Sequence, residues 1–480
     1  MDKYPVVCSG KTLKECMAII DKHAQGISFV LESGILVGVL TDGDIRRALL
    51  NNSSLEDSVD SVMNRQFVSF HVGTESKIIR ESFNQRIRHI PLLDDKGSLV
   101  DVADPNGNFR ISVLKPSLTG NELSYVTECI ETNWISSQGK FVTQFEKSFE
   151  KFHPGSHALA VSNGTVALHL ALISLGVGPG DEVIVPNLTF AASANAVIQA
   201  GASPVFCEIN PNTWCIEPNE LKRLVGPKTK AIMPVHLYGQ PCHMDSLNEV
   251  CAQFDLLMIE DCAEALGSEW KGRKVGTFGD AATFSFFGNK TISTGEGGMI
   301  LFNDSEVAQK ARILRDHGMS KNKRYWHEVV GYNYRLTNMQ AAIGVAQMEK
   351  FQEILTKKLK IASFYESALE GSLGISNLPY SVKDTLHSNW LFGVLLDVGI
   401  NVEDIISEML SRGIETRPFF HSLHTMPPYK EFRTSISLGN SETVSRRGLS
   451  LPSSVDLQEE ELQTISHNLI QIISKKIEKA

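Results

Sequence analysis

Short apolar runs alternate with helical or looped segments between residues 158 and 302 of this 480-residue chain. Four of these runs are AIMPVH, LLMIED, AATFSF and GGMILF. The strands of a parallel sheet are apolar along their whole length, because helices cover both faces of such a sheet. The pattern therefore predicts an α/β domain whose central sheet is mostly parallel, with helices on both faces.

A single lysine, Lys290, lies between two of these expected strands, at 281–286 and 298–302. The turn that carries it is rich in glycine and has apolar runs on both sides. Burying a charged ammonium group is costly, so a lysine drawn toward an apolar interior favours the free amine, which can attack a carbonyl. We therefore predict Schiff-base chemistry at Lys290. The alternative is a lysine in a surface loop, and the neighbouring segments argue against it.

Two further segments supply groups that a lysine-bound pyridoxal phosphate needs. The run 256–261 ends in two acids, and ligands of a parallel sheet bind beyond the carboxyl ends of its strands. Asp261 would there hold a pyridine nitrogen protonated, or else cap the next helix. The segment 158–172 is typical of a strand, a Ser-Asn-Gly-Thr turn and a helix, and the N–H groups at the start of such a helix suit a phosphate.

Taken together, these residues resemble the DegT-type pyridoxal-phosphate-dependent nucleotide-sugar aminotransferases, over about three quarters of the chain from Pro116 onward. The resemblance rests, in order, on SNGTVALHLAL, VIVPNLTFAASANAVIQAGASPVF, HLYGQPCHMD, IEDCAEALGSEWKG, FSFFGNKTISTGEGGM, RDHG and GYNYRLTNMQAAIG. It implies the aminotransferase fold of type I, with a small C-terminal α/β domain. The expected domains are 1–110, 111–360 and 361–480.

Carried over residue by residue, the resemblance assigns the catalytic and phosphate-binding groups. It makes Lys290 the Schiff-base lysine and the proton shuttle, and Asp261 the partner of the pyridine nitrogen. The phosphate is expected to bind the hydroxyl of Ser285 and the backbone around Gly164 and Thr165. Pyridoxal 5′-phosphate is thus the expected cofactor.

Three other positions are expected to contact the cofactor. Phe190 matches the aromatic residue that stacks on the ring, and Asn333 matches the asparagine that reaches the phosphate bound in a neighbouring subunit, which implies a homodimer or a higher homo-oligomer. Glu264 departs from the family pattern, because many relatives have Gln or His where this side chain meets the ring hydroxyl. A carboxylate at this position must be protonated or compensated.

The resemblance also implies a nucleotide-linked keto sugar as substrate and L-glutamate as amino donor, in surface polysaccharide biosynthesis. Loop 417–429 resembles that of perosamine synthases, which aminate GDP-4-keto-6-deoxymannose to GDP-perosamine. His421 and Ser422 replace the usual Tyr-Pro in this loop, which leaves the sugar open. The expected substrate contacts are Trp134, Ser136, His317 and His424. Burial in the core is the alternative for Trp134 and His317.

Two other functions stay open at this point. The first is a pyridoxal-phosphate-dependent sugar dehydratase of the same fold, but in that branch histidine replaces the lysine. The second is a catalytically silent regulatory protein that senses nucleotide. The intact Lys290, Asp261 and Ser285 argue for transamination.

Residues before about 108 lie outside this pattern and contain a weak internal repeat. They resemble a pair of cystathionine-β-synthase (CBS) domains, a module that often binds adenine nucleotides. The resemblance places Thr41 at the phosphate and Asp44 at the ribose of such a nucleotide. Asp104 and Gly107 occupy the equivalent places in the second unit, so only the first unit is expected to bind. A packing or dimerisation module without a ligand is the alternative.

Charge and cysteine usage restrict the partners and the compartment. The formal net charge is −9 and no run of more than two Lys or Arg residues occurs, so neither nucleic acid nor a membrane surface is expected as a partner. The eight cysteines are scattered singly, and no spacing suggests a metal site. The N-terminus is charged where a signal peptide would be apolar, and no unbroken apolar run is long enough to span a bilayer. We expect a cytoplasmic protein.

Overall fold

The computed structural model describes residues 4–72, 74, 76–84, 86–104, 111–320, 322–379 and 382–478. The chain divides into two compact units, of which the N-terminal one comprises 1–111 together with 407–415. The C-terminal unit comprises 112–406 and 416–480.

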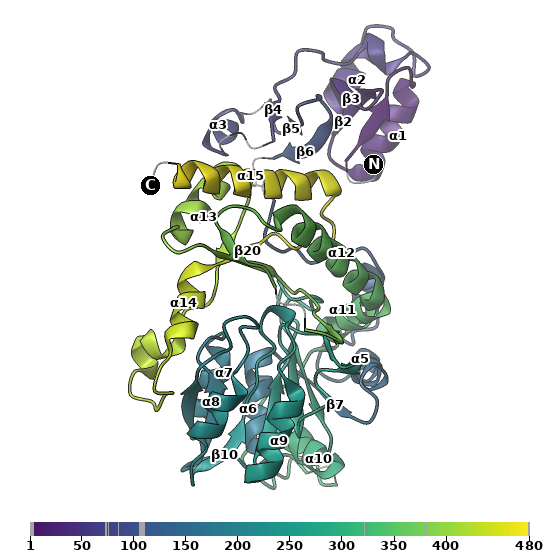
Figure 1. Cartoon of the computed structure of the whole chain (residues 1–480). Helices are drawn as coiled ribbons and strands as arrows, with labels where there is room; N and C mark the ends of the chain where they lie inside the picture. Colours follow the sequence, from purple (N-terminus) through teal and green to yellow (C-terminus); the bar gives the residue numbers. More distant parts are fainter. Residues whose placement is uncertain are drawn as a thin grey trace. The chain divides into compact units, whose positions relative to one another are not determined.

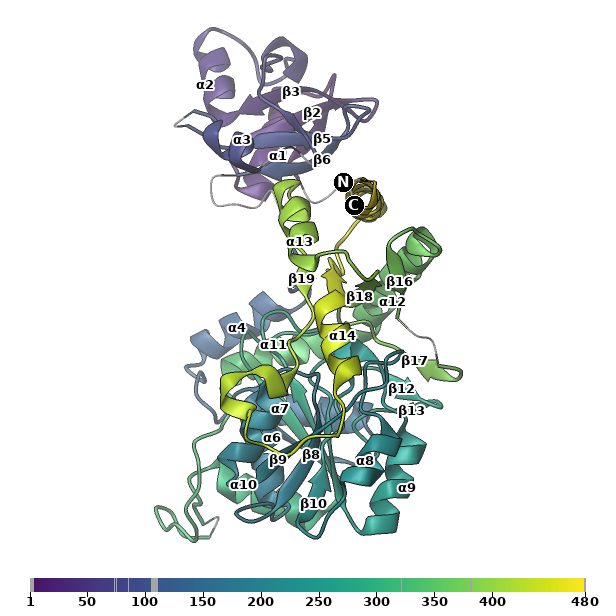
Figure 2. The ribbon, with the colours of Figure 1, turned by 60° about the vertical axis from the view of Figure 1, so that its left-hand side comes forward.

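The N-terminal unit contains two halves with the same order of elements, strand, helix, strand, strand (Figure 2). The first half contains β1 (Val6–Cys8), α1 (Leu13–His23), β2 (Ile27–Glu32) and β3 (Ile35–Thr41), followed by α2 (Asp42–Leu50) and η1 (Val59–Ser61). The second contains β4 (Phe70–His71), α3 (Ser76–Glu81), β5 (Ile90–Leu93) and β6 (Leu99–Ala103). In each half the first two strands are parallel and the last two antiparallel. The turn between the last two carries a glycine with positive φ, Gly34 or Gly97. The fold therefore contains the repeat expected from the sequence.

A seven-stranded sheet forms the centre of the C-terminal unit, in the order β7-β15-β14-β11-β10-β8-β9. Its strands are β7 (His157–Val161), β8 (Glu182–Pro186), β9 (Ser203–Cys207), β10 (Thr229–Ile232), β11 (Leu257–Asp261), β14 (Ala281–Ser285) and β15 (Gly298–Phe302). The mostly parallel sheet is confirmed, but β15, the GGMILF run, is antiparallel to both of its neighbours. The loop from β14 to β15 contains no crossover helix, and a strand reached without a crossover pairs antiparallel.

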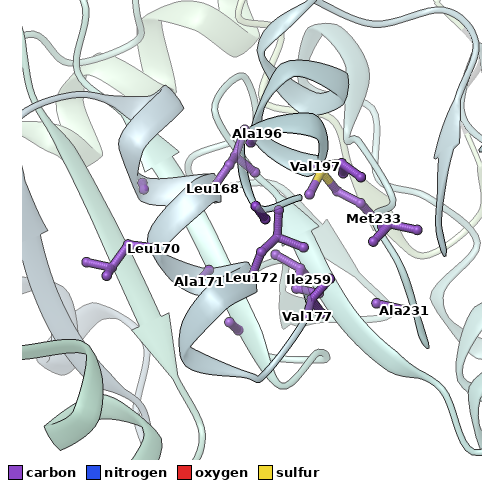
Figure 3. Close-up of a cluster of buried hydrophobic side chains, with 14 of the residues drawn as sticks. Leu168, Leu170, Ala171, Leu172, Val177, Ala196, Val197, Ala231, Met233 and Ile259 are labelled. Carbon is purple, nitrogen blue, oxygen red and sulfur yellow. The ribbon is translucent and has the colours of Figure 1, made fainter. Parts of the chain in front are cut away.

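Helices cover both faces of this sheet (Figure 1). They are α4 (Glu122–Glu131), α5 (Lys140–Phe152), α6 (Gly164–Ser174), α7 (Ala192–Gln199), α8 (Pro218–Leu224), α9 (Met244–Phe254), α10 (Ser305–Arg315) and α11 (Asn338–Glu349), with the short elements η2 (Leu237–Gly239), β12 (Glu269–Trp270) and β13 (Arg273–Lys274). Leu159 and Ile300 pack with α6, α7 and α10. Figure 3 shows part of the same cluster, with Leu168 and Leu172 of α6 near Ala196 of α7 and Ile259 of β11. Their neighbours Ala160 and Met299 pack with α5 and α11 on the other face. Because successive side chains of a strand point to opposite faces, both faces require apolar residues.

The remaining elements of the chain include a four-stranded antiparallel sheet in the order β16-β18-β20-β19 with helices around it, whereas β17 pairs with β12. They are α12 (Phe351–Leu369), β16 (Ile375–Asn377), β17 (Thr385–Leu386), β18 (Phe392–Leu396), α13 (Val402–Ser411), β19 (Arg417–Pro418), η3 (Leu423–Thr425), η4 (Pro427–Tyr429), α14 (Gly439–Arg447), β20 (Gly448–Leu451) and α15 (Glu459–Ile477). The domain boundary expected between 360 and 361 falls inside α12, so a small C-terminal domain that begins there stays a prediction. Among the described residues, no helix combines the length and apolar character that crossing a bilayer requires.

Candidate active site

Lys290 lies in the loop that follows β14, beside the end of the neighbouring strand β11. The two strands pair in register, with Asp261 opposite Thr283. The Lys290 side chain is 13% exposed, and its Nζ lies 3.4 Å from Oε1 of Glu264. The same Nζ lies 3.7 Å from the centroid of the Trp390 ring. The fold thus brings Lys290, Asp261 and Glu264 to one edge of the sheet.

Asp261 is buried at the end of β11. Its Oδ2 accepts a hydrogen bond from Oγ of Ser193 at 2.8 Å, and its Oδ1 accepts one from the N–H of Ala263 at 3.1 Å. Burial raises the pKa of this carboxyl group, and the hydrogen bond from Ser193 opposes the rise. The alternative role as a helix cap is wrong, because residues 262–268 form turns and the next element is a strand, β12.

Glu264 is a buried carboxylate with two compensating partners. Its Oε2 accepts a hydrogen bond from the N–H of Tyr238 at 2.9 Å, and its Oε1 faces Nζ of Lys290. Burial raises the pKa of Glu264, while the positive charge of Lys290 lowers it. Tyr238 has a φ of 54°, a left-handed conformation that is strained for a residue other than glycine and that is typical of functional sites.

The start of α6 contacts Ser285 at the end of β14. Asn163 caps the helix by accepting the N–H of Val166 at 3.0 Å. Among the described residues, no acceptor contacts the N–H groups of Gly164 and Thr165. A Cβ on Gly164 would lie 2.8 Å from Cβ of Ser285, so only glycine lets the helix start and the hydroxyl approach this closely. Free N–H groups at a helix start, next to a hydroxyl, form an anion site.

One cavity of about 860 Å³ connects these groups. Its lining includes Gly164, Thr165, Phe190, Asp261, Glu264, Ser285 and Lys290. Each of these residues is one that the sequence predicts at the site, and the fold brings them together.

Three aromatic side chains that were not predicted at the site, Tyr238, Trp390 and Phe420, line the same cavity. The ring of Tyr238 stacks between Trp390, at 6.1 Å between centroids, and Phe420, at 5.4 Å. Phe420 in turn contacts Phe190 at 5.7 Å. Trp390 lies just before the apolar strand β18, and the sequence pattern of β18 is that of any core strand. Its nearness to Lys290 has no local signature.

Residues 116–470 match the model of the DegT/DnrJ/EryC1/StrS aminotransferase family. The chain belongs to this family. Residues 1–51 match the CBS domain, in agreement with the resemblance of the N-terminal region.

The chain is similar to characterised aminotransferases along most of their length. It is 47% identical over 366 residues to the GDP-perosamine synthase of Caulobacter vibrioides, which covers 76% of this chain and 98% of that protein. The GDP-perosamine synthase of Vibrio cholerae is 45% identical over 74% of this chain and 97% of its own. Among solved structures, PseC of Helicobacter pylori, an aminotransferase involved in the biosynthesis of pseudoaminic acid, superposes with a TM-score of 0.72 at 27% identity. That match covers 76% of this chain and all of PseC.

Enzymes of the DegT/DnrJ/EryC1/StrS family depend on pyridoxal phosphate, which is therefore the cofactor of this chain. The site fits that group on three observations. The helix start at Gly164 and Thr165 offers free N–H donors, the buried Asp261 has no cationic partner within hydrogen-bond distance among the described residues, and the amine of Lys290 faces the cavity that joins them. When bound, pyridoxal phosphate supplies an aldehyde that condenses with amines and a ring that withdraws electrons from the substrate carbon.

The other residues expected at the active site of this aminotransferase are not among the described residues that line the cavity. Trp134 and Ser136 are exposed in the loop after α4, so burial of Trp134 in the core is wrong. His317 follows α10, and its N–H donates to the carbonyl of Tyr332 at 2.8 Å. Asn333 is exposed and accepts a hydrogen bond from Arg335. Their contacts with substrate or cofactor stay predictions.

His424, the fourth expected substrate contact, has two protein partners. Its Nδ1 lies 3.0 Å from the side-chain amide of Asn187, and its Nε2 lies 3.3 Å from Glu442. These contacts connect the strand end at β8 to α14. The structure thus places His424 as a link between segments, and its contact with substrate stays a prediction.

His236, Glu260 and Cys262 form a buried group with the spacing of metal ligands. The Nδ1 atom of His236 accepts the N–H of Cys242 at 3.0 Å, so its Nε2 carries the proton that bonds Glu260 at 3.1 Å. Glu260 also accepts the N–H groups of Gly276, Phe278 and Gly279. Protein donors therefore satisfy both the histidine and the carboxylate, and the group supports the strand that carries Asp261.

In the CBS region, Thr41 and Asp44 cap the start of α2. Oγ1 of Thr41 accepts the N–H of Asp44 at 3.2 Å, and the Asp44 carboxylate accepts the N–H of Thr41 at 2.9 Å. Arg47 pairs with the same carboxylate. Asp104 follows β6, whereas Gly107 lies outside the described residues.

Proposed function

We propose that this aminotransferase converts GDP-4-keto-6-deoxymannose to GDP-perosamine, with L-glutamate as the amino donor. The observation that carries the proposal is one cavity that contains the lysine, two buried acids and an anion-binding helix start. The GDP-perosamine synthases, at 43 to 47% identity, indicate the sugar nucleotide. Eight cysteines without a disulfide support our placement of the enzyme in the cytoplasm.

The roles follow from where each group lies. Nζ of Lys290 would hold the cofactor, and once released it would carry the proton between the substrate carbon and the cofactor, as a positioned acid and base does. Asp261 hydrogen-bonds the ring nitrogen. Ser285, with the N–H groups of Gly164 and Thr165, binds the phosphate.

Two more residues of the cavity contact the cofactor in the site that we propose. Phe190 covers the ring from the rim of the cavity, where 58% of its surface is exposed. Glu264 lies at the ring hydroxyl, with the N–H of Tyr238 and Lys290 as its compensation. Lys290 also argues against the dehydratase reaction, which uses histidine at this position.

Spectroscopy tests the reaction and the substrate separately. We expect glutamate to convert the yellow aldehyde form of the purified protein to the pyridoxamine form. A panel of GDP-, UDP- and dTDP-linked keto sugars then identifies the acceptor, which restores the yellow form. Restoration by GDP-4-keto-6-deoxymannose supports the proposal, and restoration only by a UDP- or dTDP-sugar refutes the sugar assignment. Failure to respond to glutamate would instead indicate a silent regulatory protein.

We further propose that the active site is shared between two subunits of a homodimer. Large apolar side chains are exposed beside the cavity and on the loop before Asn333: Phe287, Tyr325, Trp326 and Val330. Exposed apolar patches of this kind mark interfaces. Chains with Lys290→Ala and chains with Asn333→Trp should each be inactive, and mixed dimers should regain activity because one site carries neither change. Verified mixed dimers without activity would refute a shared site.

We also propose that the N-terminal unit binds an adenine nucleotide at Thr41 and Asp44, which the CBS match over residues 1–51 supports. Calorimetry on the full chain with ATP, ADP and AMP should show binding, and Asp44→Ala should abolish it because alanine accepts no ribose hydroxyl. Glu56→Ala, an exposed acid in the same unit, is the matched control. If the folded chain binds none of the three nucleotides, the N-terminal unit has only a packing role.

A further inference from the structure

Lys358 is a buried lysine in α12, with 1% of its surface exposed. Its Nζ donates hydrogen bonds to the carbonyl oxygens of Trp390, at 2.8 Å, and Ser453, at 2.6 Å. Burial lowers the pKa of Lys358 to about 7. A neutral amine has two N–H groups, so the two carbonyls satisfy both. Lysines are almost never buried in this way. The burial of Lys358 therefore indicates a role beyond packing.

The side chain of Trp390 makes two contacts with the turn that carries Lys290, which is called the catalytic turn below. The face of its ring lies 3.7 Å from Nζ of Lys290, and its Nε1 donates to the carbonyl of Asn289 at 2.6 Å. An aromatic face attracts a cation, and the second contact fixes the backbone next to the lysine. Trp390 therefore restrains both the amine and the chain that carries it.

The backbone that carries Trp390 is held in an uncommon conformation. Asn389, the residue before Trp390, has a φ of 51°, and Tyr238, on which the Trp390 ring stacks, has a φ of 54°. The two segments approach closely, because a Cβ on Gly239 would lie 2.8 Å from the nitrogen of Asn389. Within the described part of the chain, Oδ1 of Asn389 is buried without a partner. Such uncommon backbone conformations persist only where several surrounding contacts hold them in place. The hydrogen bond from Lys358 to the carbonyl of Trp390 is one of these contacts.

We propose that Lys358 is a positioning residue for Lys290: it fixes the backbone of Trp390, and Trp390 holds the Lys290 amine and the Asn289 carbonyl. The proposal rests on the proposed function, since it concerns how Lys290 meets the cofactor. It connects α12 to the catalytic turn through two side chains.

The first test measures how fast the apoprotein captures pyridoxal phosphate, together with hydrogen exchange of the segment 387–392. Lys358→Met keeps the unbranched side chain up to the ε position and removes the amino group with its donors. We expect capture to slow by about tenfold, from the loss of two hydrogen bonds, and exchange at 387–392 to accelerate. The control is Lys357→Met, an adjacent and exposed lysine that pairs with Glu353. It should change neither quantity.

A double-mutant cycle separates positioning from stability. If Lys358 acts through Trp390, then Lys358→Met should slow capture no further in a Trp390→Leu background, although it should still lower the melting temperature. Additive effects on capture overturn the proposal. Lys358→Gln retains two N–H donors and replaces Lys358→Met in these tests if the methionine variant does not fold. Hydrogen exchange of segment 387–392 should then be slower in Lys358→Gln than in Lys358→Ala. A wild-type protein that never captures the cofactor refutes the proposed function, whereas wild-type capture rates in Lys358→Met refute only this inference.

Discussion

Gly164→Ala is the sharpest test of the phosphate site, because the structure sets the size of the effect. The added Cβ would lie 2.8 Å from Cβ of Ser285 and 3.1 Å from its Oγ. Carbon atoms do not approach this closely, so the end of β14 or the start of α6 must shift. The backbone itself tolerates alanine, since Gly164 begins a helix and its φ is not positive. The perturbation therefore acts on the distance between the helix start and the Ser285 hydroxyl.

We expect this shift to cost the phosphate one charged hydrogen bond, about 1.5 to 3 kcal/mol. That loss corresponds to about a 10- to 160-fold weaker affinity for pyridoxal phosphate. Titration of the apoprotein with the cofactor, followed by absorbance, measures it, and a thermal melt shows whether the fold is intact. The matched control is Gly288→Ala, where an added Cβ meets nothing within 4 Å. A Gly164→Ala protein that binds the cofactor within about twofold of wild type would refute the assignment of the phosphate to this helix start.

Three other predictions test the remaining acid and base groups. Lys290→Ala should stay folded and hold the cofactor without a covalent bond, so borohydride should fix no label to the protein and turnover should vanish. Asp261→Asn should lose most of the turnover yet melt a few degrees higher than wild type without cofactor at pH 7. The reason is that burial raises the pKa of this carboxyl group, so its contribution to stability is present at acid pH and is lost as the pH rises; the gain should disappear at low pH. Burial lowers the pKa of His153 to about 4, so stability should fall by about 1.4 kcal/mol per pH unit as the pH drops from about 6.5 toward 4. His153→Phe, among Phe149 and Phe284, should remove that slope in melts across this range, and an unchanged slope would count against a neutral buried histidine.

Local sequence determined the parts of the active site that lie at strand ends and helix starts. Asp261 ends an apolar strand, Lys290 follows another, and Gly164 begins a helix, so each is visible within a window of about ten residues. In a parallel sheet such ends gather at one edge. That rule selected Lys290, Asp261 and the helix start at Gly164 and Thr165 without a structure. The family resemblance supplied the other predicted residues of the cavity, Phe190, Glu264 and Ser285.

Tertiary structure decided the contacts between residues far apart in the chain. Trp390 lies 100 positions after Lys290, and its carbonyl accepts a hydrogen bond from Lys358 of α12. Hydrophobic periodicity says that a residue is buried, but it does not say against which residue it packs. The sequence pattern of β15 likewise fits either strand direction, and only its connection to β14 made it antiparallel. His424 shows the same limit, because its partners Asn187 and Glu442 come from two distant segments that only the fold brings together.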